Sequence, residues 1–182
     1  MAANRPLTTV DDLEPGDVLF WSADTSTWRK RLKHFVSWRI QAHGRSPWNH
    51  VALYDRDLWA DRPVIIEATA HGVQLNPLSL DYDGEVWAGR PDWEPPLYDA
   101  WWRAVMWARG RIGTPYGYAD IAACLLWDVT GWYPLPATHA LICSELVGLA
   151  LAEGGNVIVP ENGVVWTPAD IARAVPPNRR LA

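Results

Sequence analysis

The feature of this sequence that most restricts its fold is the order of its hydrophobic patterns. Short apolar segments bounded by turn residues dominate the first half of the chain, whereas apolar residues at helical spacing dominate the second half. The expected strands are residues 16–21, 50–54, 64–68, 72–75 and 86–89. The expected helices are residues 27–41, 97–109, 118–128, 143–153 and a last one that starts at Thr167–Pro168. This order predicts an α+β fold in which helices pack on a small antiparallel sheet.

Length and composition indicate one folded domain. The chain has 182 residues, of which 49% are hydrophobic and 20% charged, so it can bury a core without disulfides. It contains no apolar stretch of signal-peptide length near its start and none long enough to span a membrane. We therefore expect a single soluble domain over 1–182, cytoplasmic or carried elsewhere by a virion or a secretion machine.

Charge and missing motifs exclude several classes of function. The net charge of -5 argues against a general nucleic-acid binder, and the glycine-rich loops of nucleotide-binding proteins are absent. The two cysteines, Cys124 and Cys143, form no CxxC pair, and the histidines have no metal-ligand spacing. We expect no nucleic-acid partner, no metal and no cofactor.

Cys143 is the candidate nucleophile. It stands where the helical pattern of residues 143–153 begins. The free N–H groups and the dipole at a helix N-terminus favour negative charge, which lowers the pKa of a thiol and raises its thiolate fraction. The same N–H groups can stabilise an oxyanion. Cys124 lies in an apolar helical segment and fits a core position better.

His50 and Glu67 are the candidate partners of this thiol. Alternation along strand 50–54 places His50 and Tyr54 on one face, so Tyr54 could line the site or donate a hydrogen bond to an oxyanion. Glu67 interrupts the apolar strand 64–68, and a carboxylate buried there needs a polar partner.

The hairpin that joins these two strands predicts the partner of Glu67. If its centre falls near Leu58–Trp59, Glu67 faces His50 and can orient the imidazole. A slip of one residue would turn Glu67 to the other face. His71 follows Glu67 closely and is the alternative third group. Cysteine, histidine and carboxylate together supply a nucleophile, a base and an orienting acid.

Several short segments extend this pattern along most of the chain, from residue 16 to about 175. They are Gly16–Phe20, His50–Tyr54, Ile66–Ala68 with Gly72–Val73, Gly113–Tyr116, Cys143–Val147 and Thr167–Ile171. In this order they resemble the circularly permuted branch of the NlpC-type papain-like cysteine peptidases and amidases. That branch includes the YaeF/YiiX-like proteins and the lecithin:retinol acyltransferase-like enzymes.

The resemblance implies a permuted papain-like core over about 16–175, with the histidine strand before the cysteine helix. It implies His50 as base, Glu67 as orienting residue and Cys143 as nucleophile. Tyr116, by its place in the Gly113–Tyr116 segment, is a further candidate for substrate or oxyanion contact. The implied activity is a thiol hydrolase, amidase or acyltransferase that acts through a cysteine thioester.

The substrate and the partners stay open at this stage. A cell-wall peptide, a glycopeptide or a lipid ester or amide would each fit. Residues 29–45 contain several arginines and lysines and no acid, which is compatible with contact to an anionic surface. The 13 tryptophans suit either a core or an aromatic groove. The alternatives are a non-catalytic lipid- or glycan-binding module and a virion-associated structural component.

Overall fold

The computed structural model describes residues 7–23, 46–57, 60–80, 84–93, 99–119, 130, 139–160 and 166–182. The expected helix 27–41 and the basic segment 29–45 lie outside these residues, as does all but the start of the expected helix 118–128. Among the helices in the described ranges, none combines the length and apolar character that crossing a membrane requires.

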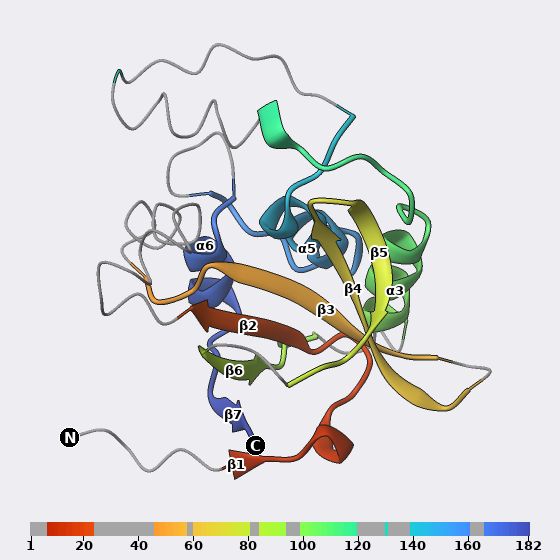
Figure 1. Ribbon diagram of the computed structural model, residues 1–182, viewed down its shortest axis with the longest axis vertical. Helices are drawn as coiled ribbons and strands as arrows, with labels where there is room; N and C mark the ends of the chain where they lie inside the picture. Colours follow the sequence, from red (N-terminus) through yellow and green to blue (C-terminus); the bar gives the residue numbers. More distant parts are fainter. Residues whose placement is uncertain are drawn as a thin grey trace.

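Seven strands of the described residues form one sheet in the order β1-β7-β6-β2-β3-β4-β5 (Figure 1). Their bounds are β1 (Leu7–Thr8), β2 (Val18–Ala23), β3 (His50–Asp57), β4 (Arg62–Thr69), β5 (Gly72–Pro77), β6 (Gly84–Gly89) and β7 (Arg179–Leu181). Every neighbouring pair is antiparallel except β1 and β7, which are parallel. The predicted α+β class is confirmed. The two-residue β1, the three-residue β7 and the short 3-10 helix η1 (Val10–Asp12) have no counterpart among the sequence-based predictions.

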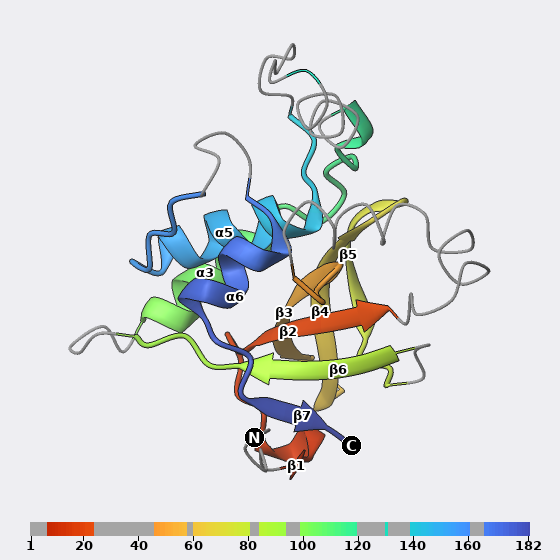
Figure 2. The ribbon, with the colours of Figure 1, turned by 90° about the vertical axis from the view of Figure 1, so that its left-hand side faces the viewer.

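The helices of the described residues lie together on one side of this sheet, as Figure 2 shows. They are α3 (Ala100–Arg109), α5 (Cys143–Glu153) and α6 (Pro168–Ala174). The start of α6 follows from its sequence, because the N–H of Asp170 donates to Thr167 Oγ1 at 3.2 Å and the N–H of Thr167 donates back to Asp170 at 2.7 Å. The predicted start of α5 at Cys143 is confirmed.

Both faces of the sheet are buried, which explains the unbroken apolar run of β3. Val51 and Leu53 belong to the core between sheet and helices. Ala52 and Tyr54 point to the opposite face, into a second core that Leu13 helps to close. The sheet therefore lies between two cores, and α5 packs on the face that the helices cover.

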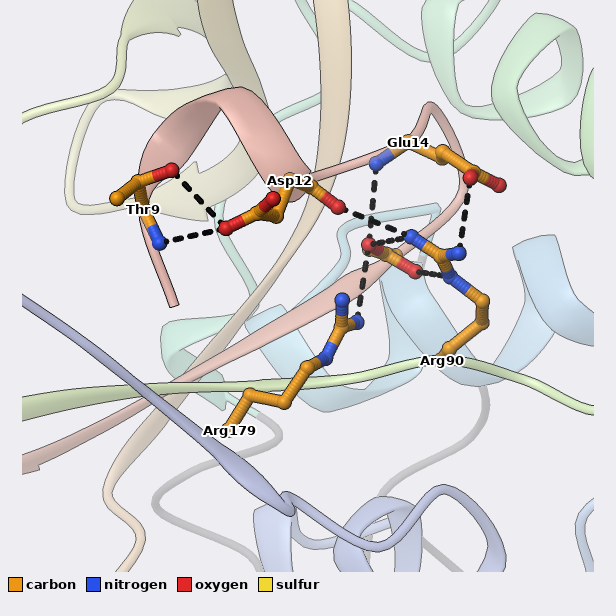
Figure 3. A network of polar contacts seen from close by, with 6 residues as sticks. Thr9, Asp12, Glu14, Arg90 and Arg179 are labelled. Carbon is orange, nitrogen blue, oxygen red and sulfur yellow. Dashed lines mark hydrogen bonds and ion pairs between the residues drawn. The ribbon is translucent and has the colours of Figure 1, made fainter. Parts of the chain in front are cut away.

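A buried acid, Asp17, joins the start of β2 to the end of β6 and to β7. Its partners Glu14, Arg90 and Arg179 are labelled in Figure 3. Arg90 donates to both of its carboxylate oxygens at 2.8 and 2.9 Å, and Arg179 donates to one of them at 3.1 Å. The N–H of Glu14 donates to the same carboxylate at 3.1 Å. Two cations and one backbone donor thus compensate the burial of a single negative charge.

We expect Asp17→Asn to lower the free energy of unfolding by about 3 kcal/mol or more, because it leaves two arginines without their shared acid. The matched control is Glu14→Gln. Glu14 also pairs with Arg90, at 2.9 Å, but its side chain is 70% exposed against 1% for Asp17. Its loss should cost less than about 1 kcal/mol. Urea unfolding of both variants measures the contrast, and equal losses would contradict a special role for Asp17.

Candidate active site

Cys143 is the first residue of α5, and its sulfur is enclosed by hydrogen-bond donors. The side chain is buried in the core between sheet and helices. The backbone N–H groups of Val51 and Ser144 hydrogen-bond to the sulfur, and so does the ring of His50. Ser144 donates its hydroxyl to the carbonyl of Trp166 at 2.7 Å, which ties this first helical turn to the segment before α6.

His50 and Glu67 lie next to one another on β3 and β4. Nε2 of His50 is 2.7 Å from Oε2 of Glu67. This contact leaves Nδ1 as the ring nitrogen that meets the thiol of Cys143. The buried ring of Trp21 packs on the imidazole with ring centroids 5.4 Å apart, so the ring is held from its side as well. The structure thus brings the three predicted residues into one hydrogen-bonded chain.

The register that achieves this differs from the predicted one. Leu53 pairs with Ile66 and Tyr54 with Ile65, which is two residues away from a hairpin in which His50 faces Glu67. A shift of two keeps both residues on the same face, because side chains alternate with period two. The register prediction is therefore wrong, but the contact forms diagonally across the strands.

The same strands part near the site. The register pairs of β3 with β4 begin at Leu53 and Ile66, although both strands continue past that point toward His50 and Thr69. The N–H of Val51 lies in this stretch and binds the sulfur of Cys143. The open end of the hairpin therefore receives the N-terminus of α5, which contacts both strands.

The electrostatics of the three groups favour a thiolate and an imidazolium. Burial works against both charges. For His50, the negative sulfur and carboxylate on either side outweigh this cost and raise the pKa from 6.5 to about 10. For Cys143, burial is outweighed by the charge and hydrogen bond of His50 and by two backbone donors, so the pKa of the thiol is lowered. Burial also disfavours the charge of Glu67, yet hydrogen bonds keep its pKa below the usual value.

Tyr116 also lies beside this group. Burial first, and then the negative charge of Cys143, raise the pKa of the Tyr116 hydroxyl, so it stays protonated. Backbone contacts bring Tyr116 here, since it bridges to Leu141, two residues before the thiol. The segment before it runs against β5, where the N–H of Val73 donates to the carbonyl of Thr114 at 2.9 Å.

A glycine permits this close approach. Gly72 has a φ of +93°, and a Cβ there would lie 2.6 Å from the carbonyl oxygen of Thr114. A side chain at position 72 would push the 113–116 segment away from β5. Gly72 therefore helps to set the position of Tyr116.

Two other predicted residues lie elsewhere. Tyr54 is fully buried in the second core, four residues along β3 from His50, about 13 Å at strand spacing. The expectation that it contacts substrate is thus not supported by its position. His71 is exposed in the turn between β4 and β5, where its N–H donates to Thr69, while Glu67 occupies the place beside His50. Cys124 lies outside the described residues.

Sequence reasoning missed Asn76. Its side-chain Nδ2 donates to Oε1 of Glu67 at 2.9 Å, so both oxygens of that carboxylate are hydrogen-bonded. The available signal was the alternation of β5, where Gln74 and Asn76 are polar on either side of Leu75. A polar pair on one face of a strand next to Glu67 indicates a possible partner.

In the described ranges, no three His, Cys, Asp or Glu residues lie together as metal ligands. A cavity of about 230 Å³ lies at Glu14, Asp17, Trp93 and Trp101. Trp93 packs against Gly154, just past the end of α5, so this cavity is at the opposite end of that helix from Cys143, about 16 Å along its axis.

Comparison with known proteins assigns no family to this chain. Neither a scan against protein-family models nor a search of curated proteins finds a match. We therefore infer the function from the geometry of the site.

We expect His50→Ala to raise the apparent pKa of Cys143, because burial then opposes the thiolate with only two backbone donors to offset it. Alkylation of Cys143 by iodoacetamide near pH 6.5 should slow at least tenfold, as followed by mass spectrometry of the labelled peptide. His71→Ala is the control, since His71 is exposed and the variant should react like the unmodified chain. Equal rates in all three proteins would show that His50 does not activate the thiol.

Proposed function

We propose that this chain is a cysteine hydrolase or acyltransferase with Cys143 as nucleophile, His50 as general base and Glu67 as orienting acid. The single observation that supports this most is the continuous chain of hydrogen bonds from the sulfur through the imidazole to the carboxylate, at the N-terminus of α5. A buried structural cysteine needs no imidazole and no carboxylate aligned behind it.

The first chemical step follows from the charges. The thiolate attacks the carbonyl carbon of an amide or ester, a C–S bond forms, and the carbonyl π electrons move onto oxygen. When the tetrahedral intermediate collapses, the bond to the leaving nitrogen or oxygen breaks, and the imidazolium of His50 donates its proton to that atom. An acyl thioester on Cys143 and a neutral His50 remain.

The second step regenerates the thiolate of Cys143 and the imidazolium of His50. His50 accepts a proton from water, or from another nucleophilic acceptor, as that molecule attacks the thioester carbonyl. The C–S bond then breaks and the carboxylic acid or the transferred acyl product leaves. Glu67 stays ionised throughout, because its task is to hold the ring and stabilise the imidazolium.

Stabilisation of the oxyanion is available from two sources. The first-turn N–H groups of α5 point toward the end of the helix where Cys143 lies. Tyr116 stays protonated and is affected by the negative charge of Cys143, and we assign its O–H as a second donor to the same oxygen. Tyr54 is too far along β3 to take part.

We further propose that the fold is a permuted papain-like core, since the histidine strand precedes the cysteine helix and helices cover one face of an antiparallel sheet. A peptide, glycopeptide or lipid carrying an amide or ester is the proposed substrate class. The proposal of an anionic-surface contact through 29–45 concerns residues outside the described ranges.

We expect Cys143→Ala to abolish turnover of an activated ester such as p-nitrophenyl acetate, with a loss of about a thousandfold or more. The thermal unfolding midpoint should change little, because alanine fills most of the space of a cysteine. Acylation of the unmodified chain should appear as an added acetyl mass on the Cys143 peptide. Retained turnover in Cys143→Ala would rule out this nucleophile and favour a binding module.

The pH dependence of acylation should be bell-shaped with an upper limb near pH 10. Below the lowered pKa of the thiol, Cys143 is protonated and does not attack. Above about 10, His50 loses the proton that the leaving group needs. Stopped-flow acylation rates from pH 5 to 11 measure both limbs, and an upper limb near the ordinary histidine value of 6.5 would contradict the ion pair.

A further inference from the structure

We propose that Asn76 is a positioning residue of this site, which holds the Glu67 carboxylate ionised and aimed at His50. This inference rests on the proposed function of Cys143, His50 and Glu67. It concerns a residue that touches neither the thiol nor the imidazole and acts through Glu67 alone.

The contact is specific in its geometry. Glu67 has two carboxylate oxygens, and each contacts a residue of a different strand. Oε2 meets His50 of β3 at 2.7 Å, and Oε1 accepts from Asn76 Nδ2 of β5 at 2.9 Å. A carboxylate bonded at both oxygens cannot rotate about its last bond without breaking one of the two contacts. Asn76 therefore fixes the direction in which Oε2 points.

The backbone holds Asn76 firmly in this position. β4 and β5 pair without interruption from Val64 with Pro77 to Thr69 with Gly72. Glu67 lies opposite Gln74, so Asn76 is its diagonal neighbour on the same face, which is within reach of an asparagine side chain. By contrast, β3 and β4 have parted near His50, so the pairing of strands alone does not align the imidazole with the carboxylate.

The chemistry of the amide suits this role. An amide N–H can only donate, so it favours the ionised form of a carboxylate over the protonated form. Glu67 is only 14% exposed on its side chain, and such burial favours protonation. A protonated Glu67 would not stabilise the imidazolium of His50, and the thiolate of Cys143 would in turn lose its counter-charge. Asn76 thus affects the reactivity of the Cys143 thiol indirectly, through the hydrogen bonds of Glu67 and His50.

The ionisable groups around this chain come from three elements. Cys143 belongs to α5 and His50 to β3, while Tyr116, in the segment after α3, is affected by the negative charge of Cys143. The charge of Glu145 acts on Tyr116, and its carboxylate accepts a hydrogen bond from the N–H of Ile142 at 3.1 Å. Changes at Asn76 therefore reach the thiol through Glu67 and His50.

Gln74 provides a matched control. It shares the strand and the face of Asn76 and lies directly opposite Glu67, and both side chains are half-buried. Its Oε1, however, accepts from the hydroxyl of Thr69 at 3.2 Å. Replacing either residue by leucine removes one polar side chain of β5, but only Asn76→Leu removes a donor to the carboxylate.

The experiment measures the rate of Cys143 alkylation by iodoacetamide from pH 5 to 10 in the full chain and in Asn76→Leu, Asn76→Asp and Gln74→Leu. Peptide mass spectrometry separates Cys143 from Cys124, and Cys143→Ala gives the background. Asn76→Leu should slow the reaction at pH 6 about tenfold, the size expected for loss of one hydrogen bond to a charged group. Gln74→Leu should stay within about twofold of the unmodified chain.

Asn76→Asp adds a signature that a structural role would not produce. Two adjacent carboxylates retain one shared proton, which keeps a donor between them at acid pH and is lost as the pH rises. The rate relative to the unmodified chain should therefore be near one at pH 5 and fall progressively toward pH 8. This variant is nearly isosteric with the original, so it also serves if Asn76→Leu does not fold.

The results distinguish failure of the proposed function from failure of the proposed role of Asn76. If the unmodified chain shows a thiol with an ordinary pKa near 8.5, the proposed function fails and the role of Asn76 fails with it. If the unmodified chain shows an activated thiol but the Asn76 variants follow the same curve, only the role of Asn76 is overturned. Equal slowing in Gln74→Leu and Asn76→Leu, without the pH signature of Asn76→Asp, would likewise reduce Asn76 to a structural residue.

Discussion

The site depends on mutual compensation of charge in a place where charge is costly. Cys143, His50 and Glu67 are all removed from most of the solvent, and burial alone would leave the thiol, the imidazole and the carboxylate neutral. Each charge persists because its neighbour carries the opposite one at hydrogen-bond distance. Removing any one group therefore changes the protonation of the other two, and the three are best considered as one titrating unit.

Three strands and one helix bring the groups of the site together. β3 contributes the imidazole and the N–H of Val51, β4 the carboxylate, β5 the amide of Asn76, and the N-terminus of α5 the sulfur. The parting of β3 from β4 creates the space into which α5 inserts its first residue. A fully paired hairpin would engage the backbone of Val51 in the sheet and leave no donor for the sulfur. The irregular end of the hairpin is thus part of the site.

A second charged centre supports the frame at the opposite end of β2. There Asp17 forms hydrogen bonds with Arg90 and Arg179. These contacts link β2, near the start of the chain, to β7, at its end. This cluster lies near the cavity lined by Trp93 and Trp101, remote from Cys143. It holds β2, β6 and β7 together, and β2 in turn carries Trp21 against the ring of His50.

The sequence by itself determined several local features of the fold and the site. Period-two alternation placed Val51 and Tyr54 on opposite faces of β3, the proline after Thr167 located the start of α6, and an acid in the apolar run 64–68 required a polar partner. Local patterns could not supply the register of β3 and β4, because a long loop leaves several pairings open. Only the tertiary structure placed Tyr116 near the sulfur, Tyr54 in the core and Asn76 behind Glu67. Such contacts join segments far apart in the chain, and they depend on how strands twist and part, which no short stretch of residues specifies.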